Sequence, residues 1–370
     1  MGGGSRMVEL NLKDIEQILF GCAVLGTGGG GDLQRGLETV RRTVKGKVVL
    51  MDVDEFGDEE LAACPYFVGS VSPTTRTKNL ERRIESPVYE SFKLLERYLG
   101  KKFGAVFPTE LGGGNTAVAF EVAAQTGAVV LDGDPVGRAV PEVQHTSFYL
   151  LNIPMTPFTV CNHFGDKMII EEVSSDEQAE QITRAVAVVS EGKVGVTSHP
   201  LKGSVLKKSL VKGTVSLAWK VGKAREEALL KGKNPVQAIA NALSAKILFE
   251  GTAESDAMWE DRDGFTYGEM HFTGVGLFRG RKFKIWFKNE NLIAWIDEQV
   301  CLTCPDLIIV LRAKDGTPVL NPHLREGEHV VVLGVATNEL WRSSGAIEVF
   351  GPRHFGFDFD EVLLNGRSEK

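Results

Sequence analysis

Residues that could do chemistry gather in three short segments of the first 150 positions. The first segment, GTGGGGD (26–32), places four consecutive glycines before an aspartate. Ordering glycine backbone costs entropy, so such a run is typical of a strained turn or of a partner that approaches the main chain closely. Backbone N–H groups at a helix start could bind an anion or a polar ring edge, whereas a tight helix–helix connection explains the run equally well. The candidate binding residues here are Gly28, Gly29, Gly30, Gly31 and Asp32.

The same run does not match the common nucleotide-binding loops. It lacks the strand followed by GxGxxG of a dinucleotide site and the GK[ST] ending of a phosphate loop. We therefore predict no nucleotide site there.

The second segment, FPTELGGGN (107–115), follows an apolar strand-like run. Glu110 lies at the strand end, and Gly113 belongs to a glycine run that leads to Asn115 at a predicted helix start. A carboxylate beside a glycine loop is a candidate for general acid or base catalysis. The alternative is a solvated glutamate on a loop.

The third segment, VVLDGDPVGRAVPEVQHTSF (129–148), contains five candidate residues. Asp132 and Asp134 directly follow an apolar run, and Arg138, Glu142 and His145 come within the next eleven positions. Two nearby carboxylates can raise each other's pKa or share a hard cation such as Mg²⁺. The alternative interpretation makes Asp132 a turn residue with Arg138 as its ion-pair partner.

Polar groups elsewhere in the chain give weaker signals. In NENLIAW (289–295), Asn289 and Glu290 could form hydrogen bonds with the donors and acceptors of a small heterocycle. The alternative is a polar hairpin tip. CNHFGDK offers Cys161, His163 and Asp166 as conceivable zinc ligands, and His199 precedes a proline in a loop. For Cys301 and Cys304 in CLTC, a strand explains the spacing better than metal or redox chemistry.

The elements that must position these residues alternate along the first half of the chain. Helices are predicted over 12–25, after Asp32, after a Ser86 cap and over 114–127, and strands over 47–53, 66–71, 103–108 and 128–134. Strands alternating with helices predict an α/β domain. In an open α/β sheet, ligands bind beyond the carboxyl ends of the strands, where all three segments would meet.

The pattern changes in the second half. Two helices are predicted over 175–192 and 213–232, followed from about 245 by short strands whose spacing suggests a barrel or sandwich. We therefore predict an α/β N-terminal domain over 7–165 and a C-terminal domain over 166–370. Residues 1–6, MGGGSR, look like an expression scar.

Composition limits the partners. A net charge of −7 with no basic block argues against nucleic acid as a partner. The sequence has no uninterrupted run of about 18 apolar residues, so we predict no membrane-spanning helix. Five scattered cysteines are typical of a reducing compartment, so we expect a cytoplasmic protein. We also expect a homo-oligomer.

Six motifs in fixed order resemble the S-methyl thiohydantoin desulfurase-like family, whose members are found beside hydantoinase/oxoprolinase proteins. They are GTGGGGD, TELGGGN, DGDPVGRAVPE, NENLIAW, PDLIIVL and GPRHFGFDFD. The resemblance runs from about Leu12 to Asp360. The resemblance implies a three-layer α/β/α N-terminal domain and a smaller β-rich, barrel-like C-terminal domain. It also implies action on a hydantoin- or thiohydantoin-type ring, with hydrolysis of the C–S bond of an S-methyl thiohydantoin as one candidate reaction.

Such a hydrolase needs a base, a proton donor and groups that hold the ring. We expect Asp132 or Asp134 as the base, with a divalent metal ion as a candidate cofactor at these two carboxylates, and Glu110 or His145 as the proton donor. Glycine-loop amides and Asn115 would hold the ring. The alternative function is a non-catalytic binding or accessory subunit of a hydantoinase/oxoprolinase system.

Overall fold

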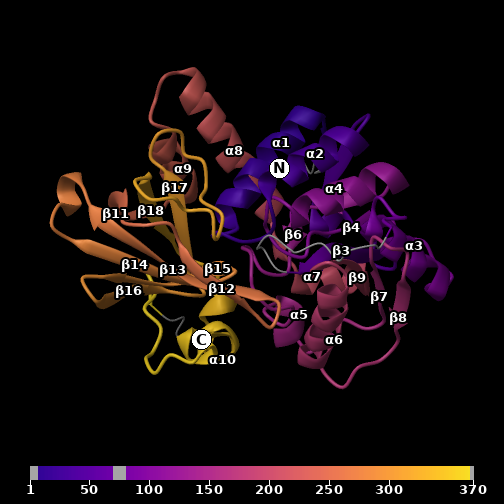
Figure 1. Cartoon of the computed structure of the whole chain (residues 1–370). Coiled ribbons are helices and arrows are strands. Elements are labelled where there is room, and N and C mark those ends of the chain that lie inside the picture. Colours follow the sequence, from indigo (N-terminus) through magenta and orange to yellow (C-terminus); the bar gives the residue numbers. More distant parts are fainter. Residues whose placement is uncertain (1–6, 70–80, 367–370) are drawn as a thin grey trace.

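The computed structural model describes residues 7–69 and 81–366, so the expected expression scar at 1–6 lies outside the described residues. The chain forms two domains with a sheet each, shown side by side in Figure 1. Within the described residues, no helix is both long and apolar enough to cross a membrane.

The first sheet has eight strands in the order β1-β2-β5-β4-β3-β9-β7-β8. The pairs β2–β5, β5–β4 and β4–β3 are parallel, and the outer pairs are antiparallel. The carboxyl ends of the four parallel strands therefore meet at one edge. The strands are β1 (Met7–Leu10), β2 (Val48–Met51), β3 (Leu61–Gly69), β4 (Ala105–Val106), β5 (Val129–Leu131), β7 (Phe158–Cys161), β8 (Lys167–Ile170) and β9 (Lys193–Lys202).

Both faces of this sheet are buried. Ala63, Val106 and Val130 belong to one core cluster, whereas their chain neighbours Ala62 and Ala105 belong to another. Helices α1 (Leu12–Leu25), α2 (Leu33–Thr43), α3 (Pro87–Leu99) and α4 (Asn115–Thr126) contribute to the first cluster. Helices α5 (Ser147–Leu150), α6 (Asp176–Val189) and α7 (Gly203–Ser209) contribute to the second.

Local capping explains where the N-terminal helices begin and end. Asp32 accepts a hydrogen bond from the backbone N–H of Arg35 at the start of α2. Ser86 does the same for Tyr89 at the start of α3, and Gly100 ends that helix in the left-handed conformation with φ of 64°. The helices predicted at these positions are confirmed.

The second sheet is antiparallel, in the order β16-β15-β14-β13-β11-β18-β17, with β12 paired to β13. Its strands are β11 (Lys246–Ala253), β12 (Met258–Arg262), β13 (Phe265–Gly274), β14 (Lys282–Lys288), β15 (Glu290–Ile296), β16 (Gln299–Thr303), β17 (Leu307–Arg312) and β18 (His329–Val335). Two short strands, β6 (Gly133–Asp134) and β10 (Val211–Lys212), form a separate ribbon.

The expected barrel is wrong, because among the described residues no ladder joins the end strands β16 and β17. At the β16 end, the backbone N–H of Thr303 instead donates to the carbonyl of Val362. On β17, Leu307, Ile309 and Leu311 point into the core that α1 also lines. Packing of β17 against the N-terminal domain thus takes the place of the β16–β17 pairing that would close a barrel.

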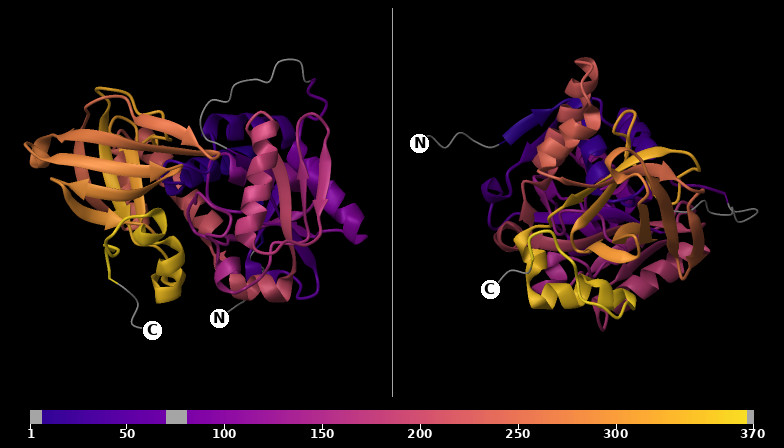
Figure 2. Two further views of the ribbon diagram at one scale, coloured as in Figure 1. Left: turned by 60° about the horizontal axis from the view of Figure 1, so that its bottom comes forward. Right: turned by 90° about the vertical axis from the view of Figure 1, so that its left-hand side faces the viewer.

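One hydrophobic core therefore spans both domains. The cluster that contains α1 and α4 also contains β17, β18 and the helices α8 (Thr214–Leu230) and α9 (Pro235–Leu243). Figure 2 shows the two domains in contact, with the C-terminal segment beside the junction. That segment holds η3 (Glu339–Arg342), α10 (Ser344–Phe350) and η4 (Pro352–Phe355), and the other short helices are η1 (Val53–Glu55) and η2 (Gly276–Phe278).

We predict that Gly21→Ala destabilises the protein, because a Cβ at Gly21 would lie 1.8 Å from the carbonyl oxygen of Ala218 on α8. This overpacking should cost about 1–3 kcal/mol, more than the roughly 1 kcal/mol that alanine gains in helix propensity. Gly46→Ala is the control, since nothing lies within 4 Å of its Cβ position. Calorimetry should give a lower Tm for the first variant only, and equal Tm values would contradict backbone contact between α1 and α8.

Candidate active site at the domain junction

The four consecutive glycines lie where the N-terminal domain contacts the C-terminal domain. A Cβ at Gly29 would lie 1.8 Å from Oε1 of Glu290, and one at Gly30 would lie 2.5 Å from Cα of Gly112. Gly28, Gly30 and Gly31 also have positive φ, between 73° and 94°. The groups that approach this backbone closely therefore belong to the protein itself.

Backbone hydrogen bonds fix the loop between the domains. The N–H of Asn291 donates to the carbonyl of Thr27 at 2.7 Å, and the N–H of Asn321 donates to the carbonyl of Gly28 at 2.8 Å. On the other side, the carbonyl of Gly30 accepts from the N–H groups of Gly114 and Asn115 at the start of α4. The loop thus joins β15, the segment after β17 and α4.

Two buried glutamates, one from each domain, lie near one another at this junction, and Glu290 contacts the loop itself. Nδ2 of Asn115 donates to Oε1 of Glu110 at 2.8 Å, and the Val140 N–H donates to Oε2 at 2.9 Å. Burial raises the pKa of Glu110 to about 7 despite these hydrogen bonds. Burial, together with the charge of Glu110, raises the pKa of Glu290 well above its usual value, although the Gly30 N–H donates to its carboxylate.

Arg138 is fully buried between the domains. Its Nε donates to the carbonyl of Ala139, Nη1 to the carbonyls of Pro305 and Asp306, and Nη2 to the Thr27 hydroxyl and the Asn291 carbonyl. A guanidinium has five N–H donors, so these five acceptors use all of them. Arg138 therefore holds chain segments together and has no donor left for a ligand.

The two aspartates that were expected to share a base or metal role have separate partners. Oδ1 and Oδ2 of Asp132 accept from the backbone N–H and the hydroxyl of Ser216, so Asp132 caps α8. Oδ1 of Asp134 accepts from the N–H groups of Val136 and Gly137, and burial raises the pKa of Asp134 to about 6. Asp132 thus stabilises the start of α8, and Asp134 stabilises the turn at Val136 and Gly137.

Asn289, Gly113 and Asp32 also have structural contacts. Oδ1 of Asn289 accepts from the Thr266 N–H at 2.9 Å, and Asn289 itself has φ of 56°. Gly113 lies against Leu33, which follows the helix cap Asp32.

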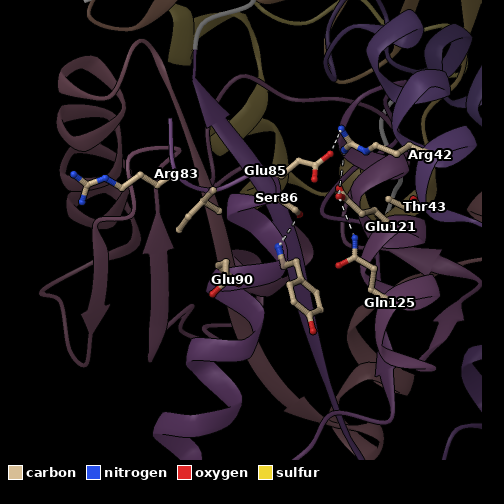
Figure 3. Close-up of a pocket in the computed structure, with 10 residues that line it drawn as sticks. Arg42, Thr43, Arg83, Glu85, Ser86, Glu90, Glu121 and Gln125 are labelled. Atoms are coloured by element: carbon tan, nitrogen blue, oxygen red, sulfur yellow. Dashed lines mark hydrogen bonds and ion pairs between the residues drawn. The ribbon is translucent and has the colours of Figure 1, made fainter. Parts of the chain in front are cut away.

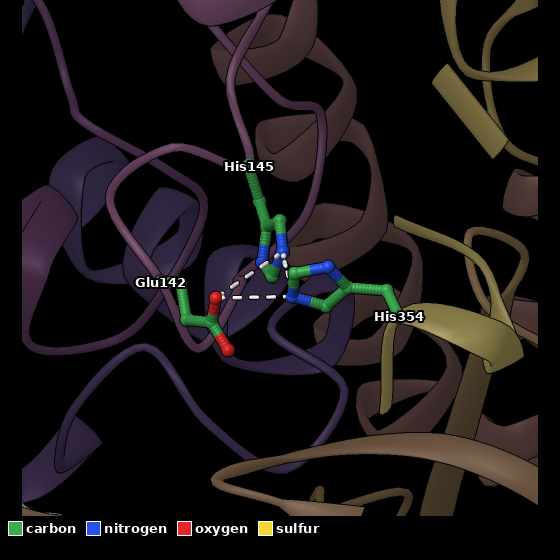
Figure 4. Close-up of side chains that lie close together, drawn as sticks. All are labelled: Glu142, His145 and His354. Carbon is green, nitrogen blue, oxygen red and sulfur yellow. Dashed lines mark hydrogen bonds and ion pairs between the residues drawn. The ribbon is translucent and has the colours of Figure 1, made fainter. Parts of the chain in front are cut away.

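Glu142, His145 and His354 bring three ligand-type atoms together at the same junction (Figure 4). Nε2 of His145 lies 3.2 Å from Nε2 of His354, which lies 3.1 Å from Oε2 of Glu142. The distance from Nε2 of His145 to the same oxygen is 3.7 Å. Among residues 7–69 and 81–366, this is the one group of three or more His, Cys, Asp or Glu side chains with mutually close ligand atoms.

The electrostatics of this group differ from those of Glu110 and Glu290. Burial would raise the pKa of Glu142, but the hydrogen bond to His354 and the charge of Lys288 hold it well below the usual range. The Lys288 ammonium pairs with Oε1 of Glu142. Burial lowers the pKa of His145 to about 3, so its ring is neutral at physiological pH.

Sequence reasoning identified Glu142 and His145 but missed His354 and Lys288. His354 is separated from Glu142 by 212 positions, and no local pattern links them. The available signal was the GPRHFGFDFD motif itself, because it places a histidine in one of the six ordered segments.

The weaker candidates form no comparable group. Burial raises the pKa of the Cys301 thiol to about 11 and that of Cys304 to about 12, so neither is a ready thiolate. Nδ1 of His163 lies 3.0 Å from the carbonyl oxygen of Ile84. His199 is buried and stacks on Phe148.

A separate cavity of about 370 Å³ lies between the end of α2, the start of α3 and α4 (Figure 3). Its lining is polar, and Arg42 and Glu85 form an ion pair of 3.0 Å there. Burial raises the pKa of Glu121 on its wall. None of the predicted site residues lines this cavity.

Comparisons with known proteins agree with the motif pattern. Residues 13–172 match the family model described as S-Me-THD-like, N-terminal domain, and residues 174–364 match S-Me-THD-like, C-terminal domain. The resemblance drawn from the six motifs is thereby confirmed. A search of curated proteins found no match.

A crystal structure of a protein from Chromobacterium violaceum is similar to this chain, with a TM-score of 0.73 and 21% sequence identity. The similarity covers 96% of this chain and 100% of the other. At this identity it shows a shared fold.

We predict that Glu290→Gln stabilises the protein increasingly as pH rises from 5 to 8. The pKa of Glu290 is raised in the fold, so the folded state keeps this proton to higher pH than the unfolded chain. The wild type therefore loses stability above the unfolded pKa of about 4.3, by up to about 1.4 kcal/mol per pH unit.

Glutamine keeps an oxygen for the Gly30 N–H and carries no charge. The Tm difference between variant and wild type should grow with pH, whereas the exposed control Glu38→Gln should show a constant difference. A Glu290→Gln difference that does not change with pH would refute the buried-charge argument.

Proposed function

This chain belongs to the S-Me-THD-like family, and we propose from that premise that it is a hydrolase of a small hydantoin- or thiohydantoin-type ring. The observation on which the proposal rests is the convergence of Glu142, His145 and His354 at the domain junction. The His354 side chain is 27% exposed, whereas that of His145 is fully buried. His354 is therefore the most solvent-exposed side chain of the group, and we propose that the substrate approaches from its side.

The candidate reaction is hydrolysis of an S-methyl thiohydantoin. Water adds to the ring carbon that bears the S-methyl group, a C–O bond forms, the C–S bond breaks, and methanethiol leaves with a proton. The enzyme must activate the water, stabilise negative charge on the leaving sulfur or ring oxygen, and hold a flat ring. We assign water activation to the Glu142, His145 and His354 group, whose Oε2 and two Nε2 atoms lie within 3.7 Å of one another.

Lys288 is suited to stabilise developing negative charge. Its ammonium pairs with Glu142 and lies 4.0 Å from the centre of the Phe265 ring and 5.8 Å from that of Phe355. Trp286 lies beside Phe355, with ring centres 6.0 Å apart. A cation with aromatic rings around it fits a flat, polar heterocycle, which can stack on a ring face while its oxygen or sulfur meets the ammonium.

Glu110 serves as a positioning residue in this proposal. Its carboxyl accepts from the Val140 N–H, two residues before Glu142, and so fixes the loop that holds Glu142 and His145. Glu290 holds the glycine loop in the same way through the Gly30 N–H. Asp132 and Asp134 receive no catalytic role, because their hydrogen bonds go to α8 and to the turn before Arg138.

We predict that purified protein releases thiol from an S-methyl thiohydantoin and that Glu142→Gln lowers kcat about 100-fold or more, as expected for loss of water activation. The control is Glu269→Gln, which removes a carboxylate from an ordinary surface pair with His271 at 3.0 Å. Thiol release, measured by a chromogenic disulfide, should be unaffected in the control.

Full turnover by folded Glu142→Gln would show that Glu142, His145 and His354 do not activate the water. Stabilisation of the wild type by hydantoin-type rings without any turnover would favour the accessory-subunit function instead.

A further inference from the structure

We propose that Glu142, His145 and His354 bind one divalent metal ion of the zinc type. The three ligand atoms are Oε2 of Glu142 and the two Nε2 atoms, separated by 3.1, 3.2 and 3.7 Å. Zinc bonds of about 2.0–2.1 Å in tetrahedral geometry place neighbouring ligand atoms about 3.3 Å apart. The triangle of side chains therefore already has the size that such an ion requires.

Proton counting supports a cation at the centre of this triangle. A carboxylate oxygen only accepts, and a neutral imidazole has one donor and one acceptor nitrogen. Without a metal ion, one N–H on Nε2 of His354 would have to donate to both Oε2 of Glu142 and Nε2 of His145. If Nε2 of His145 also carried a proton, its N–H would point at the N–H of His354. A metal ion instead accepts one lone pair from each of the three atoms.

The surrounding residues hold each ligand in place. Lys288 pairs with Oε1 of Glu142, which leaves Oε2 directed at the two histidines, and Gln144 donates to that oxygen as well. The His145 ring stacks on Phe350 with ring centres 4.7 Å apart, and the His354 ring meets Phe355 edge to face at 4.9 Å. Such outer contacts orient metal ligands.

Two imidazoles and one carboxylate favour zinc over magnesium, which prefers an all-oxygen set. Catalytic zinc sites commonly have three protein ligands and a water in the fourth position, and the partly exposed His354 leaves a path for that water. A bound water with its pKa lowered to about 7 would be the nucleophile of the proposed hydrolysis. This catalytic role rests on the proposed function, whereas metal binding does not.

The ion would also join the two domains. Glu142 and His145 lie three positions apart on one loop of the N-terminal domain, and His354 lies in η4 of the C-terminal segment. Because each family domain provides only part of the ligand set, the site exists only in the assembled chain.

The test measures zinc binding to the full chain after removal of metal with a chelator. We expect one Zn²⁺ per wild-type chain by equilibrium dialysis and elemental analysis, and an affinity at least 100-fold lower for His354→Gln. The matched control His271→Gln, from a surface histidine–carboxylate pair with no third ligand, should bind like the wild type. Cobalt substitution should give visible absorption bands in the wild type that His354→Gln lacks.

Sub-stoichiometric zinc in the wild type, or equal affinity in the two histidine variants, would overturn the proposal. If His354→Gln does not fold by circular dichroism, Glu142→Gln takes its place with the same expectations. Stoichiometric zinc without thiol release would leave the metal site standing and reject the proposed function. Thiol release by a chain that binds no zinc would reject the metal site and leave the proposed hydrolase function standing.

Discussion

The buried guanidinium of Arg138 is the group on which the domain junction depends. Its five N–H donors meet five oxygen acceptors, from Thr27 before the glycine loop, Asn291 on β15, Pro305 and Asp306 before β17, and its neighbour Ala139. Displacing any of these segments would leave a charged donor buried without a partner, which is costly in a low-dielectric interior. The segments are therefore fixed relative to one another by a single side chain.

This constraint explains how residues from opposite ends of the chain form one site. The loop that holds Glu142 and His145 begins at Arg138, so it is fixed against the C-terminal domain, where Lys288 and His354 lie. The glycine loop serves the same junction from the other side, since Gly29 has no Cβ to collide with Glu290. The candidate site is thus a property of the assembled pair of domains.

The sequence predicted what local interactions decide and missed what distant contacts decide. The helices capped by Asp32 and Ser86 were predictable because cap, proline and glycine signals lie within a few residues of each helix end. The open second sheet was not, because β17 is buried by α1 from the other domain. The contact of Asp132 with Ser216 joins residues 84 positions apart, and that of His354 with Glu142 joins residues 212 positions apart, so no local pattern indicated either contact.

Several carboxyl groups lie at this junction, and their surroundings raise the pKa of some and lower the pKa of another. Burial raises the pKa of Glu110 to about 7 and that of Glu290 well above its usual value, so both favour the protonated form relative to an exposed glutamate. Glu142 is also buried, but its pairing with Lys288 and its hydrogen bond to His354 lower its pKa. Glu142 is therefore ionised at neutral pH. A buried carboxylate that keeps its charge beside two imidazoles is suited to ligand or proton chemistry, whereas Glu110 and Glu290 are suited to holding loops.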